Sequence, residues 1–167
     1  SEDNSKYQVA QAEEAAKKEG LESVKYAVPS TNEIAQTVQV MSRQVDFIYV
    51  PLDNTIANAM QTVVKEANKA NIPVIPSVDT MVEQGGLATI GINQYQLGLQ
   101  SGKMAAELAS GKEKPETTPV YTFDQGDTVI NQSQADRLGI IVPQSMKEKA
   151  KIITDDSQQE TSKEDDK

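Results

Sequence analysis

The sequence contains no cysteine, no histidine and no tryptophan. Without cysteine the chain cannot form disulfides, thiolate metal sites or a cysteine nucleophile, and without histidine it cannot form a histidine-based triad or zinc site. Its mean hydropathy is -0.52, and no apolar run approaches the roughly 18 residues that a membrane-spanning helix needs. We therefore expect a protein that is not an enzyme, with no catalytic residue, no metal and no cofactor.

The chain is also short of positive charge, with 16 Lys and Arg against 25 Asp and Glu and a net charge of -9. Binding to nucleic acid requires clustered Lys and Arg, so a nucleic-acid partner is not expected. Residues 154–167 hold six acidic residues, two lysines and no apolar residue. Such a segment cannot bury enough surface to offset the entropy lost on ordering. We predict an acidic disordered tail over residues 151–167.

The rest of the chain alternates helix and strand patterns. Ser30 and Glu33 fit a capping box in front of a helix that carries an apolar stripe. The other predicted helices span residues 4–19, 55–71, 97–110 and 133–138, and the predicted strands span residues 24–28, 46–50, 72–77 and 87–92, with a β-pair formed by 119–123 and 128–131. Short connections between alternating strands and helices favour right-handed βαβ units on a parallel sheet. The predicted fold class is α/β, with a parallel sheet between helices.

Polar side chains follow the predicted strands where each strand ends. Ligands of open α/β sheets bind outside the carboxyl ends of the strands. The candidate ligand-binding residues at this edge are Asn4, Ser5, Asp53, Asn54, Ser77 and Asp79. The first two precede the first helix and would share the edge if a strand came before them. Carboxylates, amides, hydroxyls and helix N-terminal amides together suit a small polar ligand.

Each candidate also has a simpler structural interpretation. Asp53 and Asn54 are competent helix N-caps, and Ser77 with Asp79 could form an Asx-type turn. Asp53 could be a phosphoacceptor, but the acidic pair and late lysine of such a receiver are not in register. Asp53 and Asp79 could be read as a glycosidase pair, but nothing else in the sequence supports that reaction.

Several segments in order resemble the extracytoplasmic solute-binding proteins of ABC importers, in particular the tryptophan/tyrosine type. They are SEDNS at the start, VPLDNT at 50–55, PSVD at 76–79, ATIGINQYQLG at 88–98 and TVINQSQADRLGIIVP at 128–143. The resemblance covers residues 1–146, and several segments in the same order are more specific than any single motif.

This resemblance implies a type I periplasmic-binding-protein fold, in which two α/β lobes joined by crossover strands close on a ligand. The chain would be the C-terminal half of such a protein. Residues 1–88 and 119–150 would form the second lobe, and 89–118 would be a crossover strand and helix belonging to the first lobe. In the absence of that lobe, the helix at 97–110 would be poorly buried or rearranged.

The resemblance also implies a function. The protein would capture an amino acid, in particular an aromatic one such as tryptophan or tyrosine, and deliver it to the ABC permease. Asp53 or Asp79 would pair with the ligand ammonium, and Ser5 with the amides near Asn4 would take its carboxylate. Asn93 stands where many relatives place an aspartate. The protein would lie outside the cytoplasm, as a cell-surface lipoprotein or a periplasmic protein, with its signal and lipid anchor upstream of this chain.

The main alternative is the effector-binding core of a lac-repressor-family transcriptional regulator, which shares the fold. An upstream helix-turn-helix would favour that alternative. The acidic surface and the VPLDNT segment favour the transporter.

Overall fold

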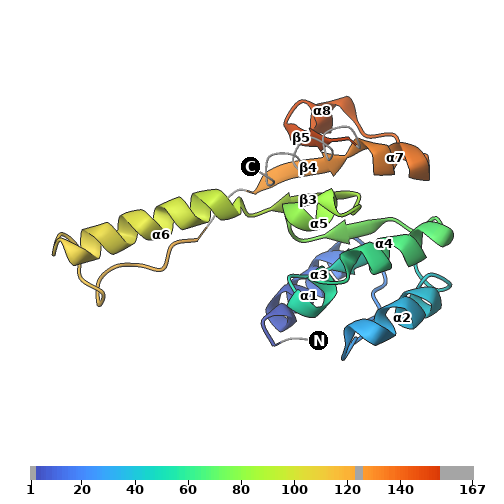
Figure 1. The fold of residues 1–167 in the computed structure, drawn as a ribbon, viewed down its shortest axis with the longest axis horizontal. Coiled ribbons are helices and arrows are strands. Elements are labelled where there is room, and N and C mark those ends of the chain that lie inside the picture. Colours follow the sequence, from blue (N-terminus) through green and yellow to red (C-terminus); the bar gives the residue numbers. More distant parts are fainter. Residues whose placement is uncertain (1–2, 123–125, 155–167) are drawn as a thin grey trace, which may run out of the picture.

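The computed structural model of the chain describes residues 3–122 and 126–154, in which short helices and strands alternate. Most of these elements gather around two small sheets, one of two strands and one of three, and one long helix, α6, projects away from the rest (Figure 1). We refer to the sheets and the helices around them as the body. The arm consists of α6 and the segment that follows it, residues 94–122.

The first half of the body follows the predicted βαβ order. Its elements are α1 (Ser5–Lys18), the 3-10 turn η1 (Thr31–Glu33), α2 (Ile34–Met41), β1 (Ile48–Val50), α3 (Asn54–Ala57), α4 (Met60–Lys69), β2 (Val74–Pro76) and α5 (Asp79–Glu83). β1 and β2 pair in parallel, with Ile48 opposite Val74 and Val50 opposite Pro76. Parallel strands need a crossover between them, which α3 and α4 provide.

The second half contains three strands and the long helix. Its elements are β3 (Ala88–Gly91), α6 (Gln94–Ala109), β4 (Asp127–Asn131), α7 (Gln132–Leu138), α8 (Gln144–Lys147) and β5 (Ala150–Ile153). β3 pairs antiparallel with β4, and β4 pairs in parallel with β5. Leu87 joins the two groups of strands, because its amide donates to Val74 and its carbonyl accepts from Asn131. The predicted α/β class is confirmed, with one antiparallel strand pair.

The core lies between α4, α2 and the sheet. Met60, Ala67 and Val74 are fully buried there, and Ile34 and Val50 pack into the same cluster. The apolar stripe predicted for residues 55–71 therefore faces the core. The single predicted helix is interrupted at Ala59, which adopts φ -126° and ψ 22°. The preceding Asn58 is a weak helix former, and the chain forms α3 and α4 instead.

Two predicted strands are wrong. Residues 24–28 form no strand in the part of the chain that the structure describes. This segment is held by side chains: Val28 is in the core, and the Tyr26 hydroxyl donates to Gln44 at 2.9 Å. Residues 119–122 also form no strand, and Phe123 lies outside the described residues. The partners of β4 are β3 and β5, which are far from it in sequence and were not identified from local patterns.

The predicted start of the tail at residue 151 is also wrong. Residues 151–153 belong to β5, and Ile153 is buried against Val82 and Val129. The rest of the predicted tail, from residue 155, lies outside the described residues. The predicted capping box does not form, because the Ser30 hydroxyl donates to the Glu33 carboxylate at 3.3 Å and makes no bond to the helix backbone.

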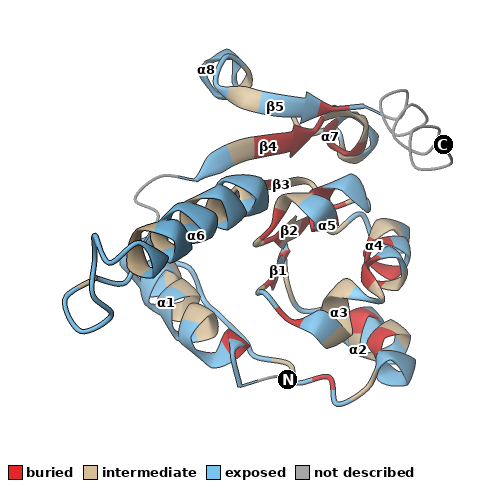
Figure 2. Ribbon diagram, turned by 60° about the vertical axis from the view of Figure 1, so that its left-hand side comes forward, coloured by how far each residue is buried: buried red, intermediate tan, exposed pale blue. Residues whose placement is uncertain are grey.

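α6 differs from every helix of comparable length in the body. None of its 16 residues is buried, and it is almost entirely exposed in Figure 2. The segment 115–121 runs beside it and leaves an open groove of about 410 Å³, lined by Leu97, Met104 and Leu108 on the helix. The expectation of a poorly buried helix in this region is confirmed.

Candidate functional site

The carboxyl ends of β1 and β2 lie side by side. Their register places Val50 opposite Pro76, and the Ser77 amide donates to the Val50 carbonyl at 3.0 Å. The loops that begin at Pro51 and Ser77 therefore leave the sheet at the same edge. This is the edge at which open α/β sheets bind their ligands, and the two loops hold four of the six candidate residues.

Ser77 provides the clearest indication of a ligand contact at this edge. Its Oγ atom is buried and has no hydrogen-bond partner among the described residues. A buried hydroxyl that makes no hydrogen bond costs free energy relative to one in water. A hydroxyl in this state at the end of a strand is ready to bond to a polar atom that enters the site.

Asp53 lies under the loop that follows β1. It is fully buried, and its Oδ1 accepts a hydrogen bond from the Ile56 amide at 3.2 Å as the N-cap of α3. Its interpretation as a helix cap is confirmed. Its contact with a ligand stays a prediction, as does that of the neighbouring Asn54, which is exposed at the first position of α3.

The start of α1 reaches the same edge. The Leu52 amide donates to Gln8 Oε1 at 2.7 Å, which holds the first turns of α1 beside the loop after β1. Ser5 is buried one turn before Gln8, whereas Asn4 is exposed and its side chain does not cap the helix. Gln8 was not among the sequence candidates. Its spacing of three residues from Ser5 places it on the same helix face and could have identified it.

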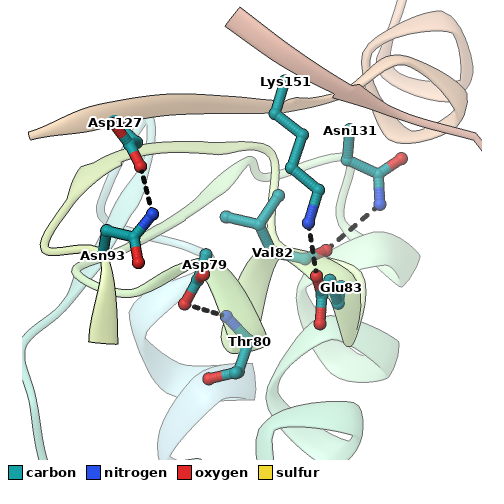
Figure 3. Close-up of polar contacts among 8 residues, drawn as sticks. All are labelled: Asp79, Thr80, Val82, Glu83, Asn93, Asp127, Asn131 and Lys151. Atoms are coloured by element: carbon teal, nitrogen blue, oxygen red, sulfur yellow. Dashed lines mark hydrogen bonds and ion pairs between the residues drawn. The ribbon is translucent and has the colours of Figure 1, made fainter. Parts of the chain in front are cut away.

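Asp79 begins α5, directly after β2. Its Oδ1 accepts from the neighbouring Thr80 amide at 2.9 Å. The other end of α5 is fixed to the strands beside it, because Asn131 donates to the Val82 carbonyl at 3.2 Å and Lys151 pairs with Glu83 at 3.1 Å (Figure 3). The position of Asp79 at the sheet edge is therefore supported by β4 and β5.

The charges near the site are local and mostly exposed. Lys6, in the first turn of α1, pairs at 2.6 Å with Asp3, which precedes the helix; this hydrogen bond lowers the pKa of Asp3 and raises that of Lys6. Burial raises the pKa of Tyr49 in β1. Among the residues that the structure describes, no group of three or more acidic side chains could hold a metal ion. No helix in the same ranges is long and apolar enough to cross a membrane.

The fold and this edge define an α/β lobe of the kind found in periplasmic binding proteins. Residues 1–153 match the family model of ABC transporter substrate-binding proteins, and the chain belongs to that family. A tyrosine-binding protein of Clostridioides difficile is 37% identical over 132 residues, which are 79% of this chain and 38% of the relative.

Solved structures agree with the family. A structure of an ABC domain in complex with L-Trp, from Streptococcus pneumoniae, is 48% identical with a TM-score of 0.84, over 91% of this chain and 52% of that one. The ligand-free, open structure of a substrate-binding protein with adhesive properties from Clostridium difficile is 36% identical with a TM-score of 0.73, over 92% of this chain and 51% of that one. The chain thus spans about half the length of these structures, and less of the curated relative.

These comparisons confirm the family that the sequence resembles and do not favour the transcriptional regulator. The structure brings Ser5, Asp53, Ser77 and Asp79 to one edge, while Asn4 and Asn54 are exposed at its rim. The role of these residues in binding, and the assignment of residues 89–118 to another lobe, stay predictions.

Proposed function

We propose that this chain forms one ligand-binding lobe of a receptor that captures an aromatic amino acid and delivers it to an ABC permease. The observation that carries the proposal is the likeness to the L-Trp complex, at 48% identity and a TM-score of 0.84. The tyrosine-binding relative supports the same ligand class. Family membership implies binding without catalysis, and the protein is proposed to act outside the cytoplasm.

The chemistry of the edge suits an amino acid. Asp79, on the first turn of α5, offers a carboxylate to the ligand ammonium, and a charge-assisted bond of this kind is stronger than one between neutral groups. The unpaired Ser77 hydroxyl lies two residues before it and can donate to the carboxylate or accept from the ammonium. The first turn of α1 lies at the positive end of the helix dipole, which suits a carboxylate.

Calorimetric titration of the intact protein tests the ligand class. We expect L-Trp or L-Tyr to bind, while leucine and ribose produce no heat of binding. Binding of ribose or leucine with no response to any aromatic amino acid would exclude the proposed ligand class. Localisation is tested separately by fractionating cells and probing the membrane and extracytoplasmic fractions for the protein.

Substitution of Ser77 tests the site itself. Ser77→Ala removes a hydroxyl without a partner in the described residues, so we expect stability to be unchanged or slightly higher while ligand affinity falls by roughly 3- to 10-fold. Ser101→Ala on α6 removes a hydroxyl that donates to the Leu97 carbonyl at 2.9 Å; it is the control for loss of a serine hydroxyl outside the ligand edge and should leave ligand affinity unchanged. Unchanged affinity in Ser77→Ala would remove Ser77 from the site.

A further inference from the structure

The arm is connected to the body where β3 ends and β4 begins, two paired strands whose ends lie side by side. We call this place, residues 91–93 and 126–127, the crossing. β3 ends at Gly91 just before α6 begins, and the chain returns to the body at Asp127, the first residue of β4. Gly91 and Asp127 face each other in the antiparallel ladder. Any change in the angle between the arm and the sheet must therefore be absorbed near these residues.

Asn93 bonds to both sides of this crossing. Its Oδ1 accepts from the Gln96 amide at 3.0 Å as the N-cap of α6. Its Nδ2 donates to Asp127 Oδ2 at 2.8 Å (Figure 3). One side chain thus links the first turn of the arm helix to the strand by which the chain returns, and holds the direction of α6 relative to β4.

The crossing also touches the candidate site. A side chain at Gly91 would place its Cβ 3.2 Å from the Ser77 carbonyl, and one at Gly126 would place it 2.9 Å from the Gly91 carbonyl. The backbones at Gly91, Gly126 and Ser77 thus leave little free space between them, so we expect a shift at the crossing to reach Ser77. The crossing is consequently in a position to couple the arm to the ligand edge.

Asn131 shows what is particular about Asn93. Both asparagines are helix N-caps that accept from the amide three residues later, and both donate across the structure with Nδ2. Asn131 is buried and donates to a backbone carbonyl, whereas Asn93 donates to an exposed carboxylate. A solvent-exposed bond between two side chains can break and re-form without unfolding the body, which is what a hinge requires.

We propose that Asn93 is a positioning residue, which acts through Asp127 to set the angle between the arm and the body and thereby the population of the protein that can close on its ligand. The inference rests on the proposed function for its effect on affinity, but its effect on the angle is independent of any ligand.

The test uses two introduced cysteines as labelling sites, because the sequence of this chain has none of its own. Lys65→Cys on α4 and Lys103→Cys on α6 replace exposed residues and carry spin labels in the intact protein, so that the distance between the labels reports the angle. Asn93→Asp keeps the oxygen that caps α6 but loses the amide that donates to Asp127. It also places two carboxylates, which repel each other, next to one another. We expect a broader and shifted distance distribution without ligand, and an affinity for L-Trp or L-Tyr weakened by roughly 3- to 10-fold.

The double variant Asn93→Asp/Asp127→Asn exchanges donor and acceptor and should restore both the distance distribution and the affinity. Thermal unfolding of Asn93→Asp is compared with that of Asn131→Asp, which alters the buried asparagine. The comparison separates a loss of folding from a change in the angle of the arm. An unchanged distance distribution in folded Asn93→Asp, or no recovery in the double variant, would overturn the inference. If the distances respond and recover while no aromatic amino acid binds, the positioning role stands and the proposed function fails.

Discussion

The helices α4 and α6 show how differently two apolar stripes can be used in one chain. α4 has ten residues, five of them buried against the sheet and α2. α6 has 16 residues, none of them buried. Both stripes recur at helical spacing, so the pattern predicts the helix in each case. Burial depends on whether a partner surface exists, and only the body provides one among the described residues.

The apolar surface of the arm extends beyond the helix. Tyr95 is 72% exposed, Ile90 beside the crossing is 72% exposed, and Val120 on the returning segment is 89% exposed. Large apolar side chains left this exposed are typical of an element whose packing partner is missing. This agrees with the prediction that residues 89–118 pack against another lobe. It also means that substitutions in the arm and in the body should change the free energy of unfolding by different amounts.

The largest difference is expected between two methionines. Met60 on α4 is fully buried, so Met60→Ala should lower the free energy of unfolding by about 2–5 kcal/mol. Met104 on α6 is half-buried beside an open groove, so Met104→Ala removes little packing and should cost less than about 1 kcal/mol. Urea denaturation followed by circular dichroism measures both values.

Hydrogen exchange of the backbone amides tests the same difference between α4 and α6. The amides of α4 should exchange only through opening of the body, and those of α6 through local fraying. Met60→Ala should speed exchange in α4 and β2, while Met104→Ala should leave them unchanged. Equal destabilisation by the two substitutions would show that the arm is part of the cooperative core.

The sequence allowed much of the body to be predicted, because its signals are local. The run 46–50 predicted a buried strand, and the stripe through Met60 and Val64 predicted the helix face that meets the core. Pairing between distant strands has no local signal, so β5 was assigned to the tail and the partners of β4 were not identified. The strand predicted at 24–28 is wrong because β-propensity alone does not provide a neighbouring strand with which the segment could form backbone hydrogen bonds.

The sequence allowed the location of the candidate site at the sheet edge to be predicted, but not the contacts of its residues. The rule for strand ends selected Asp53, Ser77 and Asp79 without any knowledge of their contacts. Ser77 Oγ has no partner in the described part of the chain, while Asp53 caps a helix; both facts depend on side-chain positions that the sequence does not specify. Asn93 was noted for its identity, but its bond to Asp127 joins residues 34 apart in the chain.

Two glycines are expected to give effects of opposite sign. A Cβ at Gly86 in the body would lie 2.7 Å from a Pro76 side-chain atom and 3.0 Å from the Met81 carbonyl, so Gly86→Ala should destabilise by about 1–3 kcal/mol. Gly98 lies within α6, and a Cβ there would meet no atom within 4 Å. Gly98→Ala should therefore stabilise the helix by about 0.5–1 kcal/mol. Thermal unfolding of both variants tests the pair, and a destabilising Gly98→Ala would mean that the exposed face of α6 is covered.

The smallest effect is expected from ion pairs, and it depends on pH. On α4, Glu66 accepts from Lys69 at 2.7 Å and from Gln39 at 2.9 Å, and these bonds lower the pKa of Glu66. A carboxylate with a lowered pKa stabilises the fold above its unfolded pKa, and this contribution disappears as the pH falls through the folded pKa. Glu66→Gln should therefore be less stable than the parent at neutral pH, and the difference should shrink below about pH 4.5.

The matching pair on the arm, Lys112 with Glu107 at 3.1 Å, serves as the control. The Glu107 side chain is 42% exposed, against 8% for Glu66. Exposed pairs contribute little, so Glu107→Gln should have nearly the same stability as the parent at both pH values. Urea denaturation at pH 7 and pH 3.5, with and without 1 M NaCl, distinguishes the two sites. A difference for Glu66→Gln that does not shrink as the pH falls would come from packing of the side chain and not from its charge. Loss of the difference in salt alone would show that the Lys69 pair within α4 contributes more to stability than the Gln39 hydrogen bond that joins α4 to α2.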